Sequence, residues 1–230
     1  MCDEVLEAGR SVVGSHAAPS GTVRVAAPAD FLDFLEVEWL AQFLTEHPRV
    51  RIELVLSDSR ADLIGEGIDV AFRGGSVDEQ RYVYRRLASQ HLKLVASPAY
   101  LKARGEPQHM PDLAEHDCLV TGPSSSATWA LSGPRGMEEA RVSGRVSANT
   151  ARALLKSCVA GLGIALLPDM LTMAELRAGR LIHVLPQYQR AGAEFCAVLP
   201  SRRQIPSAVA AFVAFATERL NSMIAYQEIS

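Results

Sequence analysis

The side chains in this chain that are best suited to metal binding or nucleophilic catalysis are its four cysteines and six histidines. The cysteines at positions 2, 118, 158 and 196 form no CxxC pair, and the histidines show no metal-ligand spacing. The chain also lacks the GxSxG, HExxH and SxxK signatures of hydrolases and peptidases. We therefore expect no catalytic residues, no bound metal and no cofactor, and the chain is not predicted to be an enzyme.

The composition indicates a globular protein and disfavours nucleic-acid binding by this chain. Its 230 residues are 48% hydrophobic and 21% charged, which fits one or two compact domains. The net charge of −3 disfavours contact with a phosphate backbone. The first residues include Asp3, Glu4 and Glu7 where a secretory signal needs an apolar run, and no apolar stretch reaches the ~20 residues that span a bilayer. Together with the scattered cysteines, these features predict a cytoplasmic protein without membrane contact.

A repeated strand–helix pattern begins at Thr22 and must position any site in the first part of the chain. Residues 22–27, 50–56 and 68–72 are rich in β-branched and aliphatic side chains, which is typical of buried strands. Apolar residues recur at helical spacing over residues 35–44, and a shorter helical pattern covers residues 60–66. Strands that alternate with helices at this pitch predict a parallel sheet covered by helices.

The rest of the chain is richer in short strands. We expect strands at residues 91–96, 117–121, 128–131, 142–146, 164–167, 181–184 and 195–199. Asn149 is expected to cap a helix that ends at Gly161-Leu-Gly163. There Gly161 would adopt a left-handed conformation, and Gly163 would allow a close backbone approach. The apolar stripe over residues 207–224 predicts an amphipathic helix at the end of the chain.

Six sequence motifs occur in an order that resembles the effector-binding domain of LysR-type transcriptional regulators. They are residues 21–28 followed by Phe31, and then residues 47–54, 62–75, 96–101, 111–119 and 160–168. The third motif reads DLIGEGIDVAFRGG, which is similar to the stretch DLI-x-EGxDVAxRxG of that family. The resemblance covers about residues 21–220, and six ordered motifs are far more specific than any single one.

The resemblance implies an α/β, type II periplasmic-binding-protein-like fold with two lobes around a cleft and a chain that crosses the hinge twice. Residues 1–20 would be the end of a linker helix and a linker. Lobe one would comprise residues 21–97 with 200–230, and lobe two residues 98–199. The expected partners are a small-molecule effector held between the lobes and a second copy in a homodimer, with a tetramer possible for the full-length protein. DNA would be bound only through a winged helix–turn–helix that would precede this chain and is absent from it.

Effector contacts are expected first at the end of the first strand, because ligands in such sheets bind at the carboxyl ends of strands. Ala29, Asp30 and Phe31 occupy this position, where relatives often have Ser or Thr. The carboxylate of Asp30 would repel an anionic effector and favour an amine or hydroxyl group. The alternative is that Asp30 is a helix N-cap that points away from the cleft.

Arg73 matches the arginine of the family stretch, and Gly74 follows it. A guanidinium beside two glycines could bind a carboxylate or sulfonate through two hydrogen bonds. The alternative is a salt bridge from Arg73 to Asp30 or Asp58. Ser57 is a candidate polar contact after the second strand, or else a solvated loop residue.

The remaining candidates lie at the hinge and in lobe two. Ser97 would lie where the chain crosses the hinge, or else would cap the following helix. Thr121, Gly122 and Ser124 follow the strand at 117–121, and Asn149 precedes a helix. The alternatives are loop polarity for Ser124 and N-capping for Asn149. Trp129 could stack on an aromatic effector, although packing is the commoner role of such a residue.

Two other functions compete with the regulator. A free solute-binding protein of the same fold would need a signal peptide, which the sequence does not show. An enzyme on this scaffold would use Asp30 or His91 as a base and would need a second reactive group beside it. For the regulator, the helix at 35–43 and the strand at 50–56 are the candidate dimer surface on one side.

Overall fold

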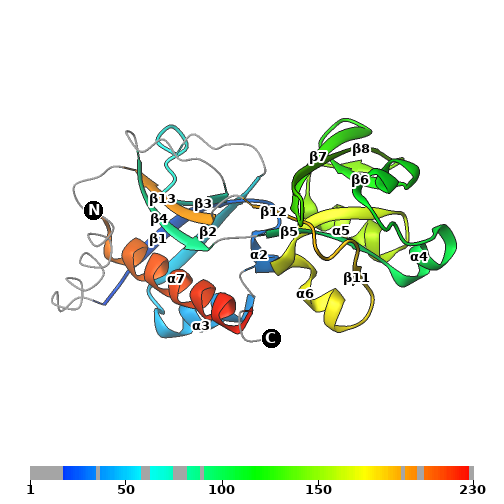
Figure 1. The fold of residues 1–230 in the computed structure, drawn as a ribbon. Coiled ribbons are helices and arrows are strands. Elements are labelled where there is room, and N and C mark those ends of the chain that lie inside the picture. The colour runs from blue at the N-terminus through cyan, green and yellow to red at the C-terminus, as the bar shows by residue number, and fades with distance from the viewer. Residues whose placement is uncertain are drawn as a thin grey trace. The chain divides into compact units, whose positions relative to one another are not determined.

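The structure is a computed structural model that divides into two compact units, residues 1–89 with 193–230 and residues 90–192. It describes residues 18–34, 37–57, 63–74, 82–88, 91–192, 195–200 and 205–227. Figure 1 labels the elements of each unit. Each unit has its own sheet and its own hydrophobic core, so the two are described separately.

The unit boundaries differ from the expected lobe boundaries of 97 and 199. Strand β5 (His91–Ala96) belongs to the second unit, because it pairs there with β10 (Ile164–Pro168). Strand β13 (Phe195–Pro200) belongs to the first unit, because it pairs with β3 (Val70–Gly74) and β4 (Tyr82–Ala88). Strand pairing therefore assigns β5 to the second unit and β13 to the first, whereas the sequence placed β5 in lobe one and β13 in lobe two. The linear sequence does not display which strands pair.

Unit 1 is built on a five-stranded sheet with the order β2-β1-β3-β13-β4. Strand β1 (Gly21–Ala27) pairs in parallel with both β2 (Val50–Leu56) and β3, which confirms the predicted parallel arrangement of these three strands. Strand β13 runs antiparallel between β3 and β4. The pattern β–α–β requires a crossover, which here runs through α2 (Phe31–Phe34) and α3 (Val37–Glu46).

The helices of unit 1 only partly follow the predicted pattern. The helix predicted over 35–44 is confirmed for residues 37–44, which belong to α3, and α2 precedes it; residues 35–36 lie outside the described residues. The helix predicted over 60–66 is wrong for residues 63–66, which form turns, and residues 60–62 lie outside the described residues. The terminal helix is confirmed as α7 (Ser207–Gln227), which packs against β1 and β4 and beside α3 (Figure 1).

Aromatic side chains fill the core of unit 1. Phe31 stacks on Phe72 with ring centroids 4.9 Å apart, and Phe72 meets Phe212 edge-on at 6.1 Å. Phe43 of α3 in turn contacts Phe212 at 5.2 Å. All four rings are fully buried, and burying each one stabilises the fold by roughly 1.5–3 kcal/mol. This aromatic core joins α2, β3, α3 and α7.

Unit 2 contains a longer sheet with the order β8-β7-β12-β5-β10-β6-β9, and β11 also pairs with β5. The strands not yet given are β6 (Cys118–Thr121), β7 (Ser126–Gly133), β8 (Gly136–Ser143), β9 (Ser147–Ala148), β11 (Ile182–His183) and β12 (Gln189–Ala191). The predicted strands at 128–131 and 142–146 are parts of the hairpin β7–β8 or overlap its end. The sequence pattern missed β12 and the short β9.

The helices of unit 2 are α4 (Pro98–Arg104), the 3-10 helix η1 (Met110–Glu115), α5 (Ala151–Val159) and α6 (Asp169–Arg177). Ser97 caps α4, because its Oγ accepts a hydrogen bond from the Tyr100 N–H at 3.3 Å. Capping was one of the two roles expected for Ser97. The prediction that Asn149 caps α5 is wrong. The cap is Thr150, whose Oγ1 accepts from the Ala153 N–H at 3.2 Å, because α5 begins one residue later than expected.

Two glycines allow backbones to meet inside unit 2. A Cβ on Gly163 would lie 2.2 Å from the Asp117 carbonyl oxygen, which confirms the predicted close approach. A Cβ on Gly144 would lie 1.9 Å from the Cys118 carbonyl oxygen. Gly161 has a φ of +82°, the predicted left-handed conformation. Trp129 is buried in the core of unit 2, which confirms the expectation that its role is packing.

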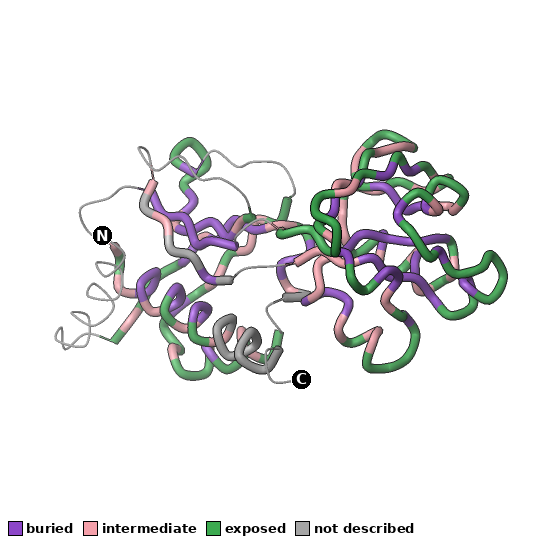
Figure 2. The backbone as a smooth tube through the Cα atoms, in the orientation of Figure 1, coloured by how far each residue is buried: buried purple, intermediate pink, exposed green. Residues whose placement is uncertain are grey.

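Burial follows the two sheets, as Figure 2 shows by its purple central strands. In unit 2 one core cluster contains Leu94, Ile164 and Trp129, and a second contains Val95, Ala165 and Leu154. Adjacent residues of β5 and β10 thus face different cores, as the alternation of a pleated strand requires. In the described part of the chain, no helix combines the length and apolar character needed to cross a bilayer.

Candidate functional site

The candidate residues of unit 1 gather at one edge of its sheet, where β1, β2 and β3 end. We call this the unit 1 edge: Ala29, Asp30, Ser57, Arg73 and Gly74. Ala27 pairs with Leu56 in the register of β1 and β2, and the Ser57 N–H donates to the Ala27 carbonyl at 2.9 Å. Three parallel strands that end together place these residues side by side, as the rule for open α/β sheets predicts.

The side chains at the unit 1 edge differ in exposure. Ala29, Ser57 and Gly74 are exposed, and Arg73, the residue before the last in β3, is half-buried. Asp30 is only 6% exposed, so its carboxylate lies among protein atoms. A salt bridge between Asp30 and Arg73 remains a prediction.

Phe31 and Asp58 are the other residues expected at this edge. Phe31 is fully buried between Phe72 and Phe195, so its ring supports the edge from below and offers no surface to solvent. Asp58, the alternative partner of Arg73, lies outside the described residues.

Both connections between the units leave from the unit 1 edge. Phe195, the first residue of β13, pairs with Gly74 at the end of β3 and with Ala88 at the end of β4. The chain therefore leaves unit 1 after Ala88 and returns before Phe195 at the same edge that holds the candidate residues.

Unit 2 has a corresponding edge, where β6 and β9 end. We call it the unit 2 edge: Thr121, Gly122 and Asn149. Thr121 pairs with Ala148, and the Gly122 N–H donates to the Ala148 carbonyl at 2.9 Å. Gly122 has a φ of +103°, a conformation that favours glycine, and Thr121 and Asn149 are exposed. Both chain connections to unit 1 also begin at this edge. The first leads into β5 at His91, the second leaves β12 after Ala191, and these two residues pair.

Ser97 does not join the unit 2 edge. Leu119 pairs with Ala165, which places Thr121 level with Leu167, and Leu167 pairs with Lys93 of β5. Ser97 lies four residues farther along that strand, roughly 13 Å away at about 3.3 Å per residue. Its hydroxyl is also used by the cap of α4. Ser97 is therefore at the opposite edge of the sheet, where β6 and β10 begin.

Ser124 has a local role in the loop that follows β6. Its side chain is exposed, and its Oγ accepts a hydrogen bond from the Ser126 N–H at 3.2 Å. This contact orders the start of β7, which is the loop role that the sequence left as an alternative.

Sequence reasoning missed two charged residues near the unit 2 edge. Asp169 is the first residue of α6 and directly follows β10, which runs parallel to β6 and ends at the same edge. Lys93 of β5 lies level with Thr121 and is half-buried. Applying the strand-end rule to the predicted strand at 164–167 would have found Asp169, whereas only the register identifies Lys93.

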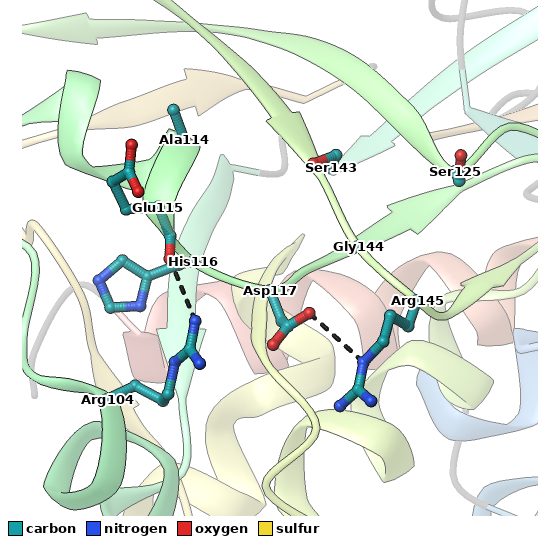
Figure 3. A pocket seen from close by; sticks show the side chains of 9 residues that line it. All are labelled: Arg104, Ala114, Glu115, His116, Asp117, Ser125, Ser143, Gly144 and Arg145. Atoms are coloured by element: carbon teal, nitrogen blue, oxygen red, sulfur yellow. Dashed lines mark hydrogen bonds and ion pairs between the residues drawn. The ribbon is translucent and has the colours of Figure 1, made fainter.

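A groove of about 330 Å³ lies at the opposite end of β6 from Thr121 (Figure 3). It is lined by Arg104, Ala114, Glu115, His116, Asp117, Ser125, Ser143, Gly144 and Arg145. Arg145 pairs with the Asp117 carboxylate at 3.6 Å and is itself 85% exposed. The Arg104 guanidinium donates to the Glu115 carbonyl at 3.3 Å. Two cationic and two anionic side chains thus meet in an open, solvated surface groove.

His116 in this groove is held by the core of unit 2. Its Nδ1 lies 3.1 Å from the Tyr100 hydroxyl, which also accepts from the Asp117 N–H at 3.0 Å. Partial burial and, next, the positive charge of Arg104 lower the pKa of His116 below its usual value. The ring is therefore neutral near pH 7, and it adds no charge to the groove.

The two thiols of unit 2, Cys118 and Cys158, are unreactive at neutral pH. Burial raises the pKa of Cys118 to about 12, and burial does the same for the pKa of Cys158. Both thiols stay protonated at neutral pH and behave as small apolar side chains. The described residues contain no group of three or more His, Cys, Asp or Glu side chains able to hold a metal ion.

Comparison with known proteins relates the chain to one family. The family model described as the LysR substrate binding domain matches residues 16–221. An uncharacterised HTH-type transcriptional regulator of Haemophilus influenzae is 31% identical over 87% of this chain and 70% of its own length. The HTH-type transcriptional regulator CrgA of Neisseria meningitidis (serogroup C) is 30% identical over 96% of this chain and 75% of its own length.

Solved structures agree with the sequence comparison. The structure of CrgA from Neisseria meningitidis has a TM-score of 0.83 at 29% identity, and covers 94% of this chain and 73% of that one. The structure of the CrgA regulatory domain alone has a TM-score of 0.79 at 30% identity, over 88% of this chain and 100% of that one.

Proposed function

The chain belongs to the LysR-type transcriptional regulators, whose substrate-binding domain it contains, and from this we propose that it senses a small-molecule effector with the unit 1 and unit 2 edges. The recognition made from six motifs is confirmed, and the fold is the α/β, type II periplasmic-binding-protein-like fold that the resemblance implied. The relatives are transcriptional regulators. A regulatory role therefore has more support than a free solute-binding protein or an enzyme.

One observation supports the position of the effector site. In each unit, the edge that holds the polar candidates is also the edge from which both connections leave. An effector bound at either edge would therefore lie at the end of the unit where the chain leaves and returns. Ala29, Asp30, Ser57, Arg73 and Gly74 would contact it from unit 1, and Thr121, Gly122 and Asn149 from unit 2.

The chemistry of the two edges suggests the class of effector. Arg73 offers a guanidinium that can bind a carboxylate or sulfonate through two hydrogen bonds, and Asp30 offers a carboxylate for an amine or hydroxyl. Thr121 and Asn149 add neutral donors and acceptors. The effector is therefore a small polar acid, and a hydroxyl or amino group on it would suit Asp30.

Effector binding would control DNA through the rest of the regulator. The domain would form a homodimer in the cytoplasm, and a bound effector would shift its conformation or packing and so alter how the DNA-binding domains contact an operator. The part of unit 1 formed by β2 and α3 suits the dimer contact, because β2 is an edge strand and Val37 of α3 is 53% exposed.

The test is a thermal-shift screen of this chain against small carboxylates, sulfonates, amines and sugars. A ligand at 100 times its dissociation constant adds about 2.7 kcal/mol of stability. We expect a carboxylate or sulfonate to bind and Arg73→Ala to abolish the shift. Arg51→Ala is the matched control, since it removes an exposed arginine from the start of β2, at the opposite end of that strand from Ser57.

The outcomes separate the alternatives. A cation that binds equally well to Arg73→Ala would move the principal contact to Asp30. A ligand lost in Arg51→Ala but kept in Arg73→Ala would contradict the unit 1 edge as the site. Absence of any binding by the folded chain would contradict the small-effector model.

A further inference from the structure

The segment that returns the chain from unit 2 to unit 1 has an unusual environment. Residues 181–191, which we call the return segment, follow α6 and pair with β5 twice. His183 of β11 pairs with Val95, and Gln189 of β12 pairs with Lys93. The Val184 N–H donates to the Leu94 carbonyl at 2.9 Å. The return segment thus depends on β5 for its position and ends at the second connection.

His183 is the exceptional residue of the return segment. Its Nδ1 is enclosed by protein and has no hydrogen-bond partner. Among the described residues, the other such atom is Arg24 Nε, which has a charge partner in Glu53 at 3.3 Å. A buried ring nitrogen without a partner costs free energy and calls for an explanation.

The charged groups near His183 are Lys93 of strand β5 and Asp169 of helix α6. Cross-strand pairing puts His183 beside Val95, and Lys93 lies two residues from Val95 on the same face of β5. Asp169 approaches from the start of α6. Burial and, next, the Lys93 charge lower the pKa of His183, while the Leu94 carbonyl and Asp169 act in the opposite direction.

Protonation of His183 would therefore oppose the pairing of β11 with β5. The Nδ1 atom has no hydrogen-bond partner in the folded chain, and the Leu94 carbonyl, which favours the charged ring, already accepts from the Val184 N–H at 2.9 Å. The new positive charge would also lie near Lys93 in a partly dehydrated environment. Both costs disappear if the return segment detaches and water reaches the ring.

The backbone conformation of Leu185 shows that tertiary packing, and not the intrinsic preference of its residues, holds the return segment in place. Leu185 has a φ of +47°, and it is the non-glycine residue with a positive φ in the described part of the chain. Its side chain is nevertheless buried in the same core as Tyr188. Tertiary packing maintains a backbone conformation that leucine disfavours, so weakening the β11 pairing should release more than one residue.

We propose that His183 makes the return segment a pH-responsive latch, which is closed on β5 at neutral pH and opens when mild acid protonates the ring. Because the return segment leads into the second connection, opening would change the regulator's response to its effector. That last consequence rests on the proposed function, whereas the latch itself does not require any effector.

Hydrogen exchange of the chain without ligand tests the latch directly. Amide protection of residues 181–191, Val184 included, is measured at about pH 7.5 and 5.5 and corrected for the intrinsic exchange rate. An ordinary histidine pKa near 6.5 in the open form limits the pH effect to about tenfold over this range. We expect protection to fall at the lower pH in the native chain, by no more than that tenfold limit, and to stay unchanged in His183→Gln. His109→Gln is the control, because that ring is exposed and lies away from β5.

A second variant keeps the proposal testable if His183→Gln fails to fold. Lys93→Met removes the neighbouring cation, so the pKa of His183 should rise towards its usual value and the pH effect on exchange should shrink. Side-chain NMR titration of His183 gives an independent readout. An ordinary His183 pKa in the native chain, or the same pH effect in His183→Gln, would overturn the latch and leave the effector proposal untouched.

Discussion

The unit 1 edge and the unit 2 edge are built in different ways. At the unit 1 edge, charged side chains of opposite sign lie above a stack of fully buried aromatic rings. At the unit 2 edge, neutral polar residues follow short strands, and the backbone of this unit relies on glycines that let strands meet closely. In the proposed site, Asp30 and Arg73 of unit 1 would supply the charged contacts and Thr121 and Asn149 of unit 2 the neutral ones, although the charged residues Lys93 and Asp169 lie near the unit 2 edge.

The largest expected effect is a loss of stability that is confined to unit 1. Phe31→Ala removes a fully buried ring from the unit 1 core and should cost about 3–5 kcal/mol. Hydrogen exchange resolved by segment should show the loss of protection in unit 1, with β5 and β10 of unit 2 unaffected. Phe31→Leu, which refills most of the volume, should cost less. Equal loss in both units would mean that they unfold together.

The next effect tests the backbone packing of unit 2. Gly144→Ala places a Cβ against the Cys118 carbonyl and should cost roughly 1–3 kcal/mol or more, because a backbone atom cannot move aside alone. The control is Gly105→Ala, where a φ of +84° disfavours alanine but no atom lies within 4 Å. Thermal unfolding should show the larger loss for Gly144→Ala. A comparable loss for both variants would contradict the steric explanation.

A smaller effect distinguishes structure from binding at the unit 2 edge. Thr150→Ala removes the cap of α5 and should cost about 1 kcal/mol. Asn149→Ala should change stability by less than about 0.5 kcal/mol, since the side chain is exposed. If Asn149 contacts the effector, its variant should nevertheless reduce the effector-induced thermal shift. The opposite ranking in stability would restore Asn149 as the cap.

The smallest expected effect is a pH dependence of stability, which arises from two histidines of unit 2. Partial burial lowers the pKa of both His116 and His183, and both belong to unit 2. The unfolded chain then binds more protons than the folded chain below about pH 6.5, so stability falls as the pH decreases through that range. Partial exposure keeps the effect modest. Thermal unfolding between about pH 7.5 and 5.5 should show it, and His116→Gln with His183→Gln should remove most of it.

Local patterns in the sequence were enough to predict much of both units. Alternating strands and helices predicted the parallel β1, β2 and β3, and ordered motifs identified the family. The strand-end rule also grouped Asp30, Ser57 and Arg73 at one edge, because the carboxyl ends of parallel strands lie at the same end of a sheet. Thr150 was missed as a cap because Asn149 and Thr150 are both good capping residues and only backbone geometry selects one.

The sequence by itself therefore determined the family, the fold class and which residue types follow each strand. Only the tertiary structure decided that β5 belongs to unit 2 and β13 to unit 1, and that Ser97 lies at the edge opposite Thr121. Register and strand order depend on contacts between residues far apart in the chain. A pattern of local spacing holds no information about them.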